Sequence, residues 1–143
     1  MDMNVFAFTT SYNYISNKLM NSVIAIYNDK TYESNLAQWD TGATNTCISK
    51  TVVEQLGLTP LGKVENQTAS GIETVNQYRI DIKLPNGMLI KDVFVIDSEI
   101  GNHGIDFLIG MDIINLGDFS VSNFDGKNHF YISYTINSNN RLC

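Results

Sequence analysis

The feature that most constrains the fold is a strict alternation of apolar and polar residues. Apolar side chains stand at every second position from Tyr78 to Leu84, a Pro-Asn-Gly turn signal follows at residues 85–87, and an apolar run returns over residues 90–96. A period of two residues is typical of a strand with one face in a core. Asn-Gly supplies the positive φ that a tight hairpin needs. The segment therefore predicts a β-hairpin.

Strand signals of the same kind recur along the chain. SVIAIYN (22–28) and TYESNLAQW (31–39) read as one hairpin, and DFSVSNF (118–124) and KNHFYISY (127–134) as another, joined by Asp-Gly. A loop containing Gly101, His103 and Gly104 leads to a short apolar strand at residues 107–110. Helical spacing occurs over residues 49–57, where Ser49 suits an N-cap and Gly57 a C-terminal stop, and briefly in MDIINLG. At 143 residues this predicts one all-β domain with one or two short helices.

Composition excludes several classes of function. The formal net charge is −6 and no basic run occurs, which argues against nucleic acid or an anionic membrane surface as a partner. No apolar stretch approaches a membrane span, and the N-terminus lacks the pattern of a signal peptide, so the cytoplasm is the simplest location. Cys47 and Cys143 fit neither a disulfide framework nor a zinc site. We expect no metal and no cofactor.

The chemistry that remains centres on Asp40 in the stretch AQWDTGATNTCIS (37–49). The chain contains no HExxH, GxSxG, P-loop or GxGxxG motif. A carboxylate at the end of an apolar strand is costly to bury unless it is paired or hydrogen-bonded. Asp-Thr-Gly alone is also compatible with a simple turn in which Asp caps its own backbone. Its context is more informative, because a short helix follows and FLIGMDII (107–114) forms a second apolar strand that runs into Gly and a helix.

On these residues the chain resembles the retropepsin-type aspartic proteases, a single-domain class. DTGA at residues 40–43 matches the active-site signature of that family, and LIGMDII at 108–114 resembles its second hallmark. The segment 68–71 lies between two strands, where the family carries its flap. The resemblance covers residues 22–134 and implies a closed β-barrel domain there. Residues 1–21 are then an N-terminal extension of unknown role, and residues 135–143 a C-terminal tail.

The resemblance implies an activity that agrees with elementary chemistry. Aspartic proteases need two carboxylates that share one proton, because like charges so close cannot both be ionised. The ionised acid acts as general base on a water, and the protonated acid polarises the scissile carbonyl. This chain has a single Asp-Thr-Gly, so the second acid must come from a symmetric partner chain. We therefore expect a homodimeric endopeptidase that cuts extended, mostly apolar peptide segments.

Individual roles follow from the matched positions. Asp40 is the expected catalytic acid and base, and Thr41 is expected to hydrogen-bond across the dimer axis. Gly42 is expected to allow a tight turn and to direct its N–H at the carboxylate. Residues expected to bind substrate are Ala43, which leaves room for the peptide, and those of a hairpin that closes over it: Thr68, Ala69, Ser70, Gly71 and Ile72.

Three further features receive separate interpretations. Asp112 is expected to be structural, since an Asp at the start of a helix is favoured by the unpaired N–H groups there. Trp39 stands where the family carries a smaller aliphatic residue, and strand alternation turns it away from Asp40, towards a core layer. Residues 1–21 could form an interface strand, cover the cleft or remain unpacked.

Two alternatives to a protease stay open at this point. The first is a retropepsin-like domain that binds peptides or dimerises partners without cleaving them; the intact Asp-Thr-Gly argues against it. The second is a small acidic β-barrel in which Asp-Thr-Gly is only a turn. Replacing Asp40 by Asn distinguishes these alternatives from a protease, because only a protease loses an activity.

Overall fold

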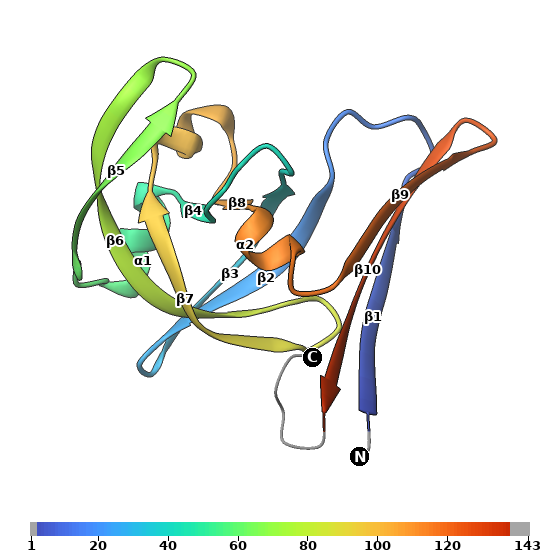
Figure 1. Ribbon diagram of the computed structural model, residues 1–143, viewed down its shortest axis with the longest axis horizontal. Coiled ribbons are helices and arrows are strands. Elements are labelled where there is room, and N and C mark those ends of the chain that lie inside the picture. The colour runs from blue at the N-terminus through green and yellow to red at the C-terminus, as the bar shows by residue number, and fades with distance from the viewer. Residues whose placement is uncertain (1–2, 138–143) are drawn as a thin grey trace.

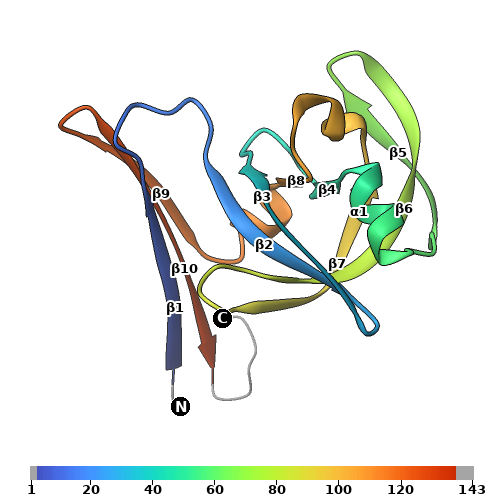
Figure 2. The same ribbon diagram turned by 180° about the vertical axis from the view of Figure 1, so that it is seen from behind.

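The computed structural model describes residues 3–137 (Figures 1 and 2). A seven-stranded sheet has the order β2-β3-β8-β4-β7-β6-β5, and an additional pairing of β2 with β6 closes six of these strands into a barrel. The strands of this sheet are β2 (Met20–Tyr27), β3 (Lys30–Trp39), β4 (Cys47–Ile48), β5 (Gly62–Thr68), β6 (Gly71–Lys83), β7 (Leu89–Asp97) and β8 (Phe107–Ile109). The fold is thus all-β with a closed barrel, as the sequence predicted.

The barrel strands include two parallel pairs in an otherwise antiparallel arrangement. β3 runs parallel to β8, and β4 runs parallel to β7. The β3–β8 register places Trp39 opposite Ile109, so both strands end at the same edge of the barrel. The residues that follow each strand, Asp40 and Gly110, therefore lie next to each other.

A second sheet of three strands, in the order β1-β10-β9, stands beside the barrel (Figures 1 and 2). β1 (Met3–Ser11) pairs along its whole length with β10 (Lys127–Asn137), which also pairs with β9 (Asp118–Phe124). Much of the segment 1–21, whose role the sequence left open, is therefore a strand that pairs within its own chain. β10 also reaches into the expected tail 135–143, of which residues 138–143, including Cys143, lie outside the described residues.

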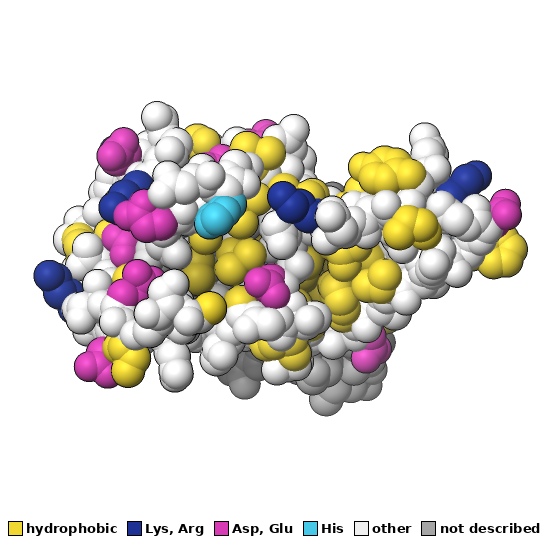
Figure 3. All heavy atoms as spheres, turned by 90° about the horizontal axis from the view of Figure 1, so that it is seen from above, with side chains coloured by type: hydrophobic (Ala, Val, Ile, Leu, Met, Phe, Trp, Pro, Cys, Tyr) yellow, Lys and Arg dark blue, Asp and Glu magenta, His cyan; other side chains and the backbone are white. Residues whose placement is uncertain are grey.

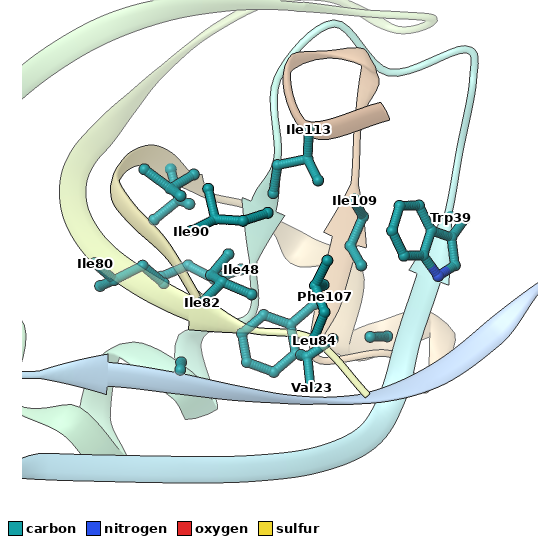
Figure 4. Close-up of a cluster of buried hydrophobic side chains, with 14 of the residues drawn as sticks. Val23, Trp39, Ile48, Ile80, Ile82, Leu84, Ile90, Phe107, Ile109 and Ile113 are labelled. Atoms are coloured by element: carbon teal, nitrogen blue, oxygen red, sulfur yellow. The ribbon is translucent and has the colours of Figure 1, made fainter. Parts of the chain in front are cut away.

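Trp39 joins the two sheets. Its ring lies 6.2 Å from that of Phe8 in β1, 5.9 Å from Phe119 in β9 and 6.1 Å from Phe130 in β10, measured between centroids. Its indole N–H donates to Asn21 Oδ1 at 2.9 Å. The expectation that Trp39 fills a core layer is confirmed. Figure 4 shows it beside Ile109, next to the aliphatic side chains that fill the barrel.

Local sequence signals account for the helices and turns. α1 (Lys50–Leu56) begins after Ser49, whose Oγ accepts from the Val52 N–H, and ends at Gly57, which has a φ of 60°. Both predicted caps are confirmed. In the 85–87 turn only Gly87 takes a positive φ, at 83°, so Asn86 does not share that role.

Two further short helices flank β8. A 3-10 helix, η1 (Glu99–His103), occupies the segment expected to be a loop, and Gly104 ends it with a φ of 75°. α2 (Met111–Ile114) follows β8 directly. Within residues 3–137, no helix has both the length and the apolar character needed to cross a membrane.

Candidate active site

Asp40 follows the last residue of β3 and begins a tight turn. Its backbone N–H donates to Ile109 O at 2.9 Å, which continues the β3–β8 pairing by one residue. The Ala43 N–H donates to Asp40 O at 3.2 Å, which closes the turn. The Asp40 side chain is half-buried, while Thr41 and Gly42 are exposed. The barrel thus holds the backbone of Asp40 and leaves the turn itself accessible.

The Asp40 carboxylate accepts a hydrogen bond from its own turn. The Gly42 N–H donates to Asp40 Oδ1 at 2.8 Å. A Cβ at residue 42 would lie 3.1 Å from the same oxygen, which is tighter than an ordinary contact. Glycine therefore lets the amide approach the carboxylate, and the N–H stabilises negative charge on that oxygen.

The loop after Asp40 packs against the junction of β8 and α2 without room for a side chain at Gly110. A Cβ there would lie 2.8 Å from Ala43 O and 2.9 Å from the carbonyl atoms of Asn45. The Met111 N–H also donates to Ala43 O at 2.8 Å. The two segments that the sequence marked as motifs are therefore in direct backbone contact.

Asp112 fixes the same loop from its far side. The Asp112 carboxylate accepts from the Thr46 hydroxyl at 2.7 Å, from the Thr46 N–H at 3.0 Å and from the Ile113 N–H at 3.0 Å. The Thr46 hydroxyl oxygen in turn accepts from the Gly110 N–H at 3.2 Å. With three donors on its carboxylate, Asp112 has the structural role that the sequence predicted.

A groove of about 500 Å³ lies between the Asp40 turn and the tip of the β5–β6 hairpin. We call it the Asp40 groove. Its lining residues are Asp40, Gly42, Ala43, Thr44, Asn45, Cys47, Asn66, Gln67, Thr68, Ala69, Ser98 and Leu108. The groove thus brings together five residues that the sequence singled out: Asp40, Gly42, Ala43, Thr68 and Ala69.

The remaining site residues from the sequence lie outside this lining. Thr41 is exposed on the Asp40 turn, and Ser70, Gly71 and Ile72 belong to the exposed tip and outer arm of the hairpin. The tip is held by its own bonds: the Thr68 hydroxyl donates to Gly71 O at 3.1 Å and accepts from the Ser70 N–H at 3.2 Å. Ile72 is 68% exposed, so the hairpin tip projects from the barrel.

Sequence reasoning missed seven lining residues. They are Thr44, Asn45, Cys47, Asn66, Gln67, Ser98 and Leu108. Strand alternation could have indicated Asn66, since it shares a strand face with Thr68. Ser98 and Leu108 reach the groove only through the pairing of β4 with β7 and β8, which no local pattern reveals.

Cys47 lines the Asp40 groove and is a core residue, with 7% of its surface exposed. Burial raises the pKa of the Cys47 thiol to about 11, and the nearby carboxylates of Asp112, Glu73 and Asp40 add to this shift. The thiol is therefore protonated at neutral pH. Among the residues that the structure describes, no three His, Cys, Asp or Glu side chains are grouped so that they could hold a metal ion.

Known protein families were compared with the chain, and one family matches the segment that contains the candidate site. A family model described as "gag-polyprotein putative aspartyl protease" matches residues 28–116, which include Asp40, the β5–β6 hairpin and Asp112. A search of curated proteins returned no match.

Solved structures share the fold at low sequence identity. A retropepsin-like aspartic protease from Rickettsia conorii is 15% identical with a TM-score of 0.66, over 94% of this chain and 96% of that one. EIAV protease, complexed with the inhibitor HBY-793, is 19% identical with a TM-score of 0.52, over 73% of this chain and 90% of that one. The first alignment reaches beyond residues 22–134, the span of the resemblance seen in the sequence.

Proposed function

Since the chain belongs to the gag-polyprotein putative aspartyl protease family, we propose that it is an aspartic endopeptidase that acts as a homodimer. The retropepsin-like fold expected from the sequence is confirmed by the structural comparisons. The observation that carries the proposal is the Asp40 groove, which a carboxylate and the tip of a projecting hairpin line together. Such a groove suits an extended peptide that passes over an acid and under a hairpin.

The position of Asp40 supports the need for a second chain. Thr41 and Gly42 are exposed and Asp40 is half-buried, so the turn is open to a partner. The acid nearest to it in the second motif, Asp112, is engaged by three donors. A two-fold axis beside the turn brings two Asp40 carboxylates together, with the Thr41 hydroxyls positioned to bridge the subunits.

In this dimer the two carboxylates share one proton, because two negative charges at hydrogen-bonding distance repel strongly. The ionised Asp40 removes a proton from a water, whose oxygen then forms a bond to the scissile carbonyl carbon. The other Asp40 gives its proton to the carbonyl oxygen, which yields a gem-diol. The first Asp40 then gives the proton taken from the water to the amide nitrogen, one gem-diol hydroxyl gives its proton to the second Asp40, and the C–N bond breaks. The products are a carboxylic acid and an amine, and the acid pair regains a single proton.

The surrounding groups have supporting roles. The Gly42 N–H bond to Asp40 Oδ1 keeps the carboxylate oriented within its turn. The main chain of the hairpin tip, residues 68–71, supplies hydrogen bonds to the peptide backbone in the manner of an added strand. Closure of the hairpin excludes bulk solvent from the groove that holds the attacking water and the scissile bond.

The test is cleavage of a mixture of peptides from denatured protein between pH 4 and pH 7, at concentrations where the chain is shown to be dimeric. We expect cuts with the wild type and none with Asp40→Asn, whose carboxamide keeps the shape of the side chain but cannot act as a base. Asp29→Asn is the matched control, because Asp29 is an exposed turn residue away from the groove. Dimeric protein that cuts nothing would favour a domain that binds peptides without cleaving them.

A further inference from the structure

We propose that the Asp40 groove selects a neutral, hydrogen-bonding side chain of the substrate, that of Asn, Gln, Ser or Thr. This inference rests on the proposed function, since it concerns the residues beside the bond that is cut. It departs from the expectation of mostly apolar substrate segments only at the two symmetric positions that contact the grooves of a dimer. The walls, the charge and the floor of the groove each support it.

The lining includes three residues that carry a carboxamide: Asn45 from the loop after Asp40, and Asn66 and Gln67 from β5. Asn66 and Gln67 are consecutive in the strand, so their side chains point to opposite faces. A carboxamide offers both N–H donors and an acceptor oxygen, so it can pair with another amide or with a hydroxyl. An aliphatic side chain in the same place would remove water from these groups without replacing its hydrogen bonds, which is unfavourable. Figure 3 shows the molecule from above Figure 1, with hydrophobic side chains in the hollows of that face and both uncoloured atoms and some charged side chains around them.

The orientation of the Asn66 amide is fixed by its neighbour in the hairpin. Asn66 Nδ2 donates to Glu73 Oε1 at 3.1 Å. Because a carboxylate only accepts, the NH₂ end of the amide must face Glu73. This leaves Oδ1 and the second N–H of Asn66 to bind a ligand, and the side chain is already ordered before the ligand arrives. A preordered polar group loses less entropy on binding.

The charge of the groove disfavours ionised side chains. Among the described residues, Asp40 is the single charged one in the lining, and in the proposed reaction Asp40 is committed to the water and the scissile carbonyl. Lys50, at the start of α1, lines a separate pocket and not the Asp40 groove. Its Nζ lies 2.7 Å from Glu99 Oε1, so its charge is already paired. An acidic substrate side chain would therefore find carboxylate rather than cation beside it, and a basic one would compete with the reaction for Asp40.

The floor of the groove is apolar. Cys47, Leu108 and Ala43 contribute to it, and the Cys47 thiol is protonated at neutral pH. A side chain with a short aliphatic stem and a polar head satisfies both parts of the groove, because its stem contacts the floor and its head reaches the carboxamides. Asn, Gln and Thr each combine aliphatic carbon atoms with a polar end group, and Ser is the smallest side chain of this kind.

Two-fold symmetry of the dimer also predicts where the preferred residues lie in the substrate. Each subunit brings one Asp40 groove, and the two grooves are related by the axis that passes between the two Asp40 residues. The preference must then occur twice, at equal distances on either side of the bond that is cut.

The experiment is to sequence the products that wild-type dimer makes from a denatured-protein peptide mixture and to compare residue frequencies around the cuts. We expect the four neutral polar residues to be enriched roughly threefold to tenfold at two symmetric positions, the range given by a hydrogen bond of about 1 kcal/mol. Asn45→Leu and Asn66→Leu, on separate segments, should each shift those positions towards Leu and Ile. Gln55→Leu removes an exposed carboxamide on α1, outside the groove, and should leave the preference unchanged.

The outcomes separate the two proposals. Cuts that depend on Asp40 but show aliphatic or charged residues at every flanking position would overturn the subsite assignment and leave the peptidase intact. The subsite assignment would also be overturned if both Leu variants retain activity and keep the wild-type preference. A lack of Asp40-dependent cuts by the dimer would overturn the peptidase, and the subsite assignment with it.

Discussion

Thr46 and Asp112 form a paired contact that holds the loop after the Asp40 turn against α2. The Thr46 hydroxyl donates to Asp112 Oδ1 at 2.7 Å and the Thr46 N–H donates to Oδ2 at 3.0 Å. Thr46 is fully buried, so water cannot replace either bond. The placement of the catalytic turn in our proposal therefore depends on an acid that takes no part in the reaction.

Replacing Asp112 by Ala should destabilise the protein by about 2–4 kcal/mol, because it leaves a buried hydroxyl and a buried N–H without an acceptor. The free energy of unfolding in urea measures this loss. Asp118→Ala is the control, since Asp118 is exposed at the start of β9, and it should change that free energy by less than about 0.5 kcal/mol. Equal effects of the two variants would contradict the role assigned to Asp112.

Gly110→Ala should lower the free energy of unfolding by about 1–3 kcal/mol, since the added Cβ meets backbone atoms that cannot move aside cheaply. Its nearest neighbours would be Ala43 O and the carbonyl group of Asn45, at 2.8–2.9 Å. Gly62→Ala is a matched control, because a Cβ there meets nothing within 4 Å. We expect Gly110→Ala also to reduce cleavage more than its stability loss explains, since the Asp40 turn must shift. If Gly110→Ala leaves the free energy of unfolding unchanged, residue 110 does not lie close to the backbone of Ala43 and Asn45.

Phe8→Ala should cost about 3 kcal/mol of stability, because Phe8 packs against Trp39 and Phe130 where the two sheets meet. Thr9→Ala changes the next residue of β1, which is exposed, and should be close to neutral. Trp39 is the single tryptophan of the chain, so its fluorescence reports the unfolding of this junction directly. If Phe8→Ala unfolds like the wild type, β1 is not part of the stable fold.

Cys47 should make stability fall in alkaline solution. The folded thiol has its pKa raised from 9.0 to about 11 by burial, so the unfolded chain releases the proton first. Its contribution to stability is complete below pH 9 and is lost as pH rises towards 11, by about 2–3 kcal/mol in total. Unfolding free energies at pH 8 and pH 10.5, compared between wild type and Cys47→Ala, isolate this loss from other alkaline groups. Parallel pH profiles would contradict a buried, protonated thiol.

Much of the fold could be predicted from local patterns. The hairpins of β2–β3, β6–β7 and β9–β10 were readable because alternation and turn residues act over a few positions. The caps of α1 were readable for the same reason, since Ser49 and Gly57 act on adjacent backbone groups. The segment of β1 was not assigned, because its pairing with β10 joins residues that are more than one hundred positions apart in sequence.

The candidate site divides in the same way. Asp40, Gly42 and Ala43 were identified because they form one contiguous motif, and the hairpin tip because two strand signals flank it. Asn45 and Asn66, which also line the groove, were not identified, because a groove between a loop and a hairpin exists only after the barrel closes. The close approach of Gly110 to Ala43 likewise arises from the parallel pairing of β3 with β8.

The central claim is that one catalytic centre is built from two copies of Asp40. We would mix wild-type and Asp40→Asn chains in equal amounts under denaturing conditions, refold them together and measure the cleavage rate at constant total protein. If each centre needs both carboxylates, random pairing leaves about one quarter of the wild-type rate. A rate of about three quarters would mean that one Asp40 in a dimer suffices, and a rate of about one half would mean that each chain acts on its own. Either result would contradict the shared acid pair.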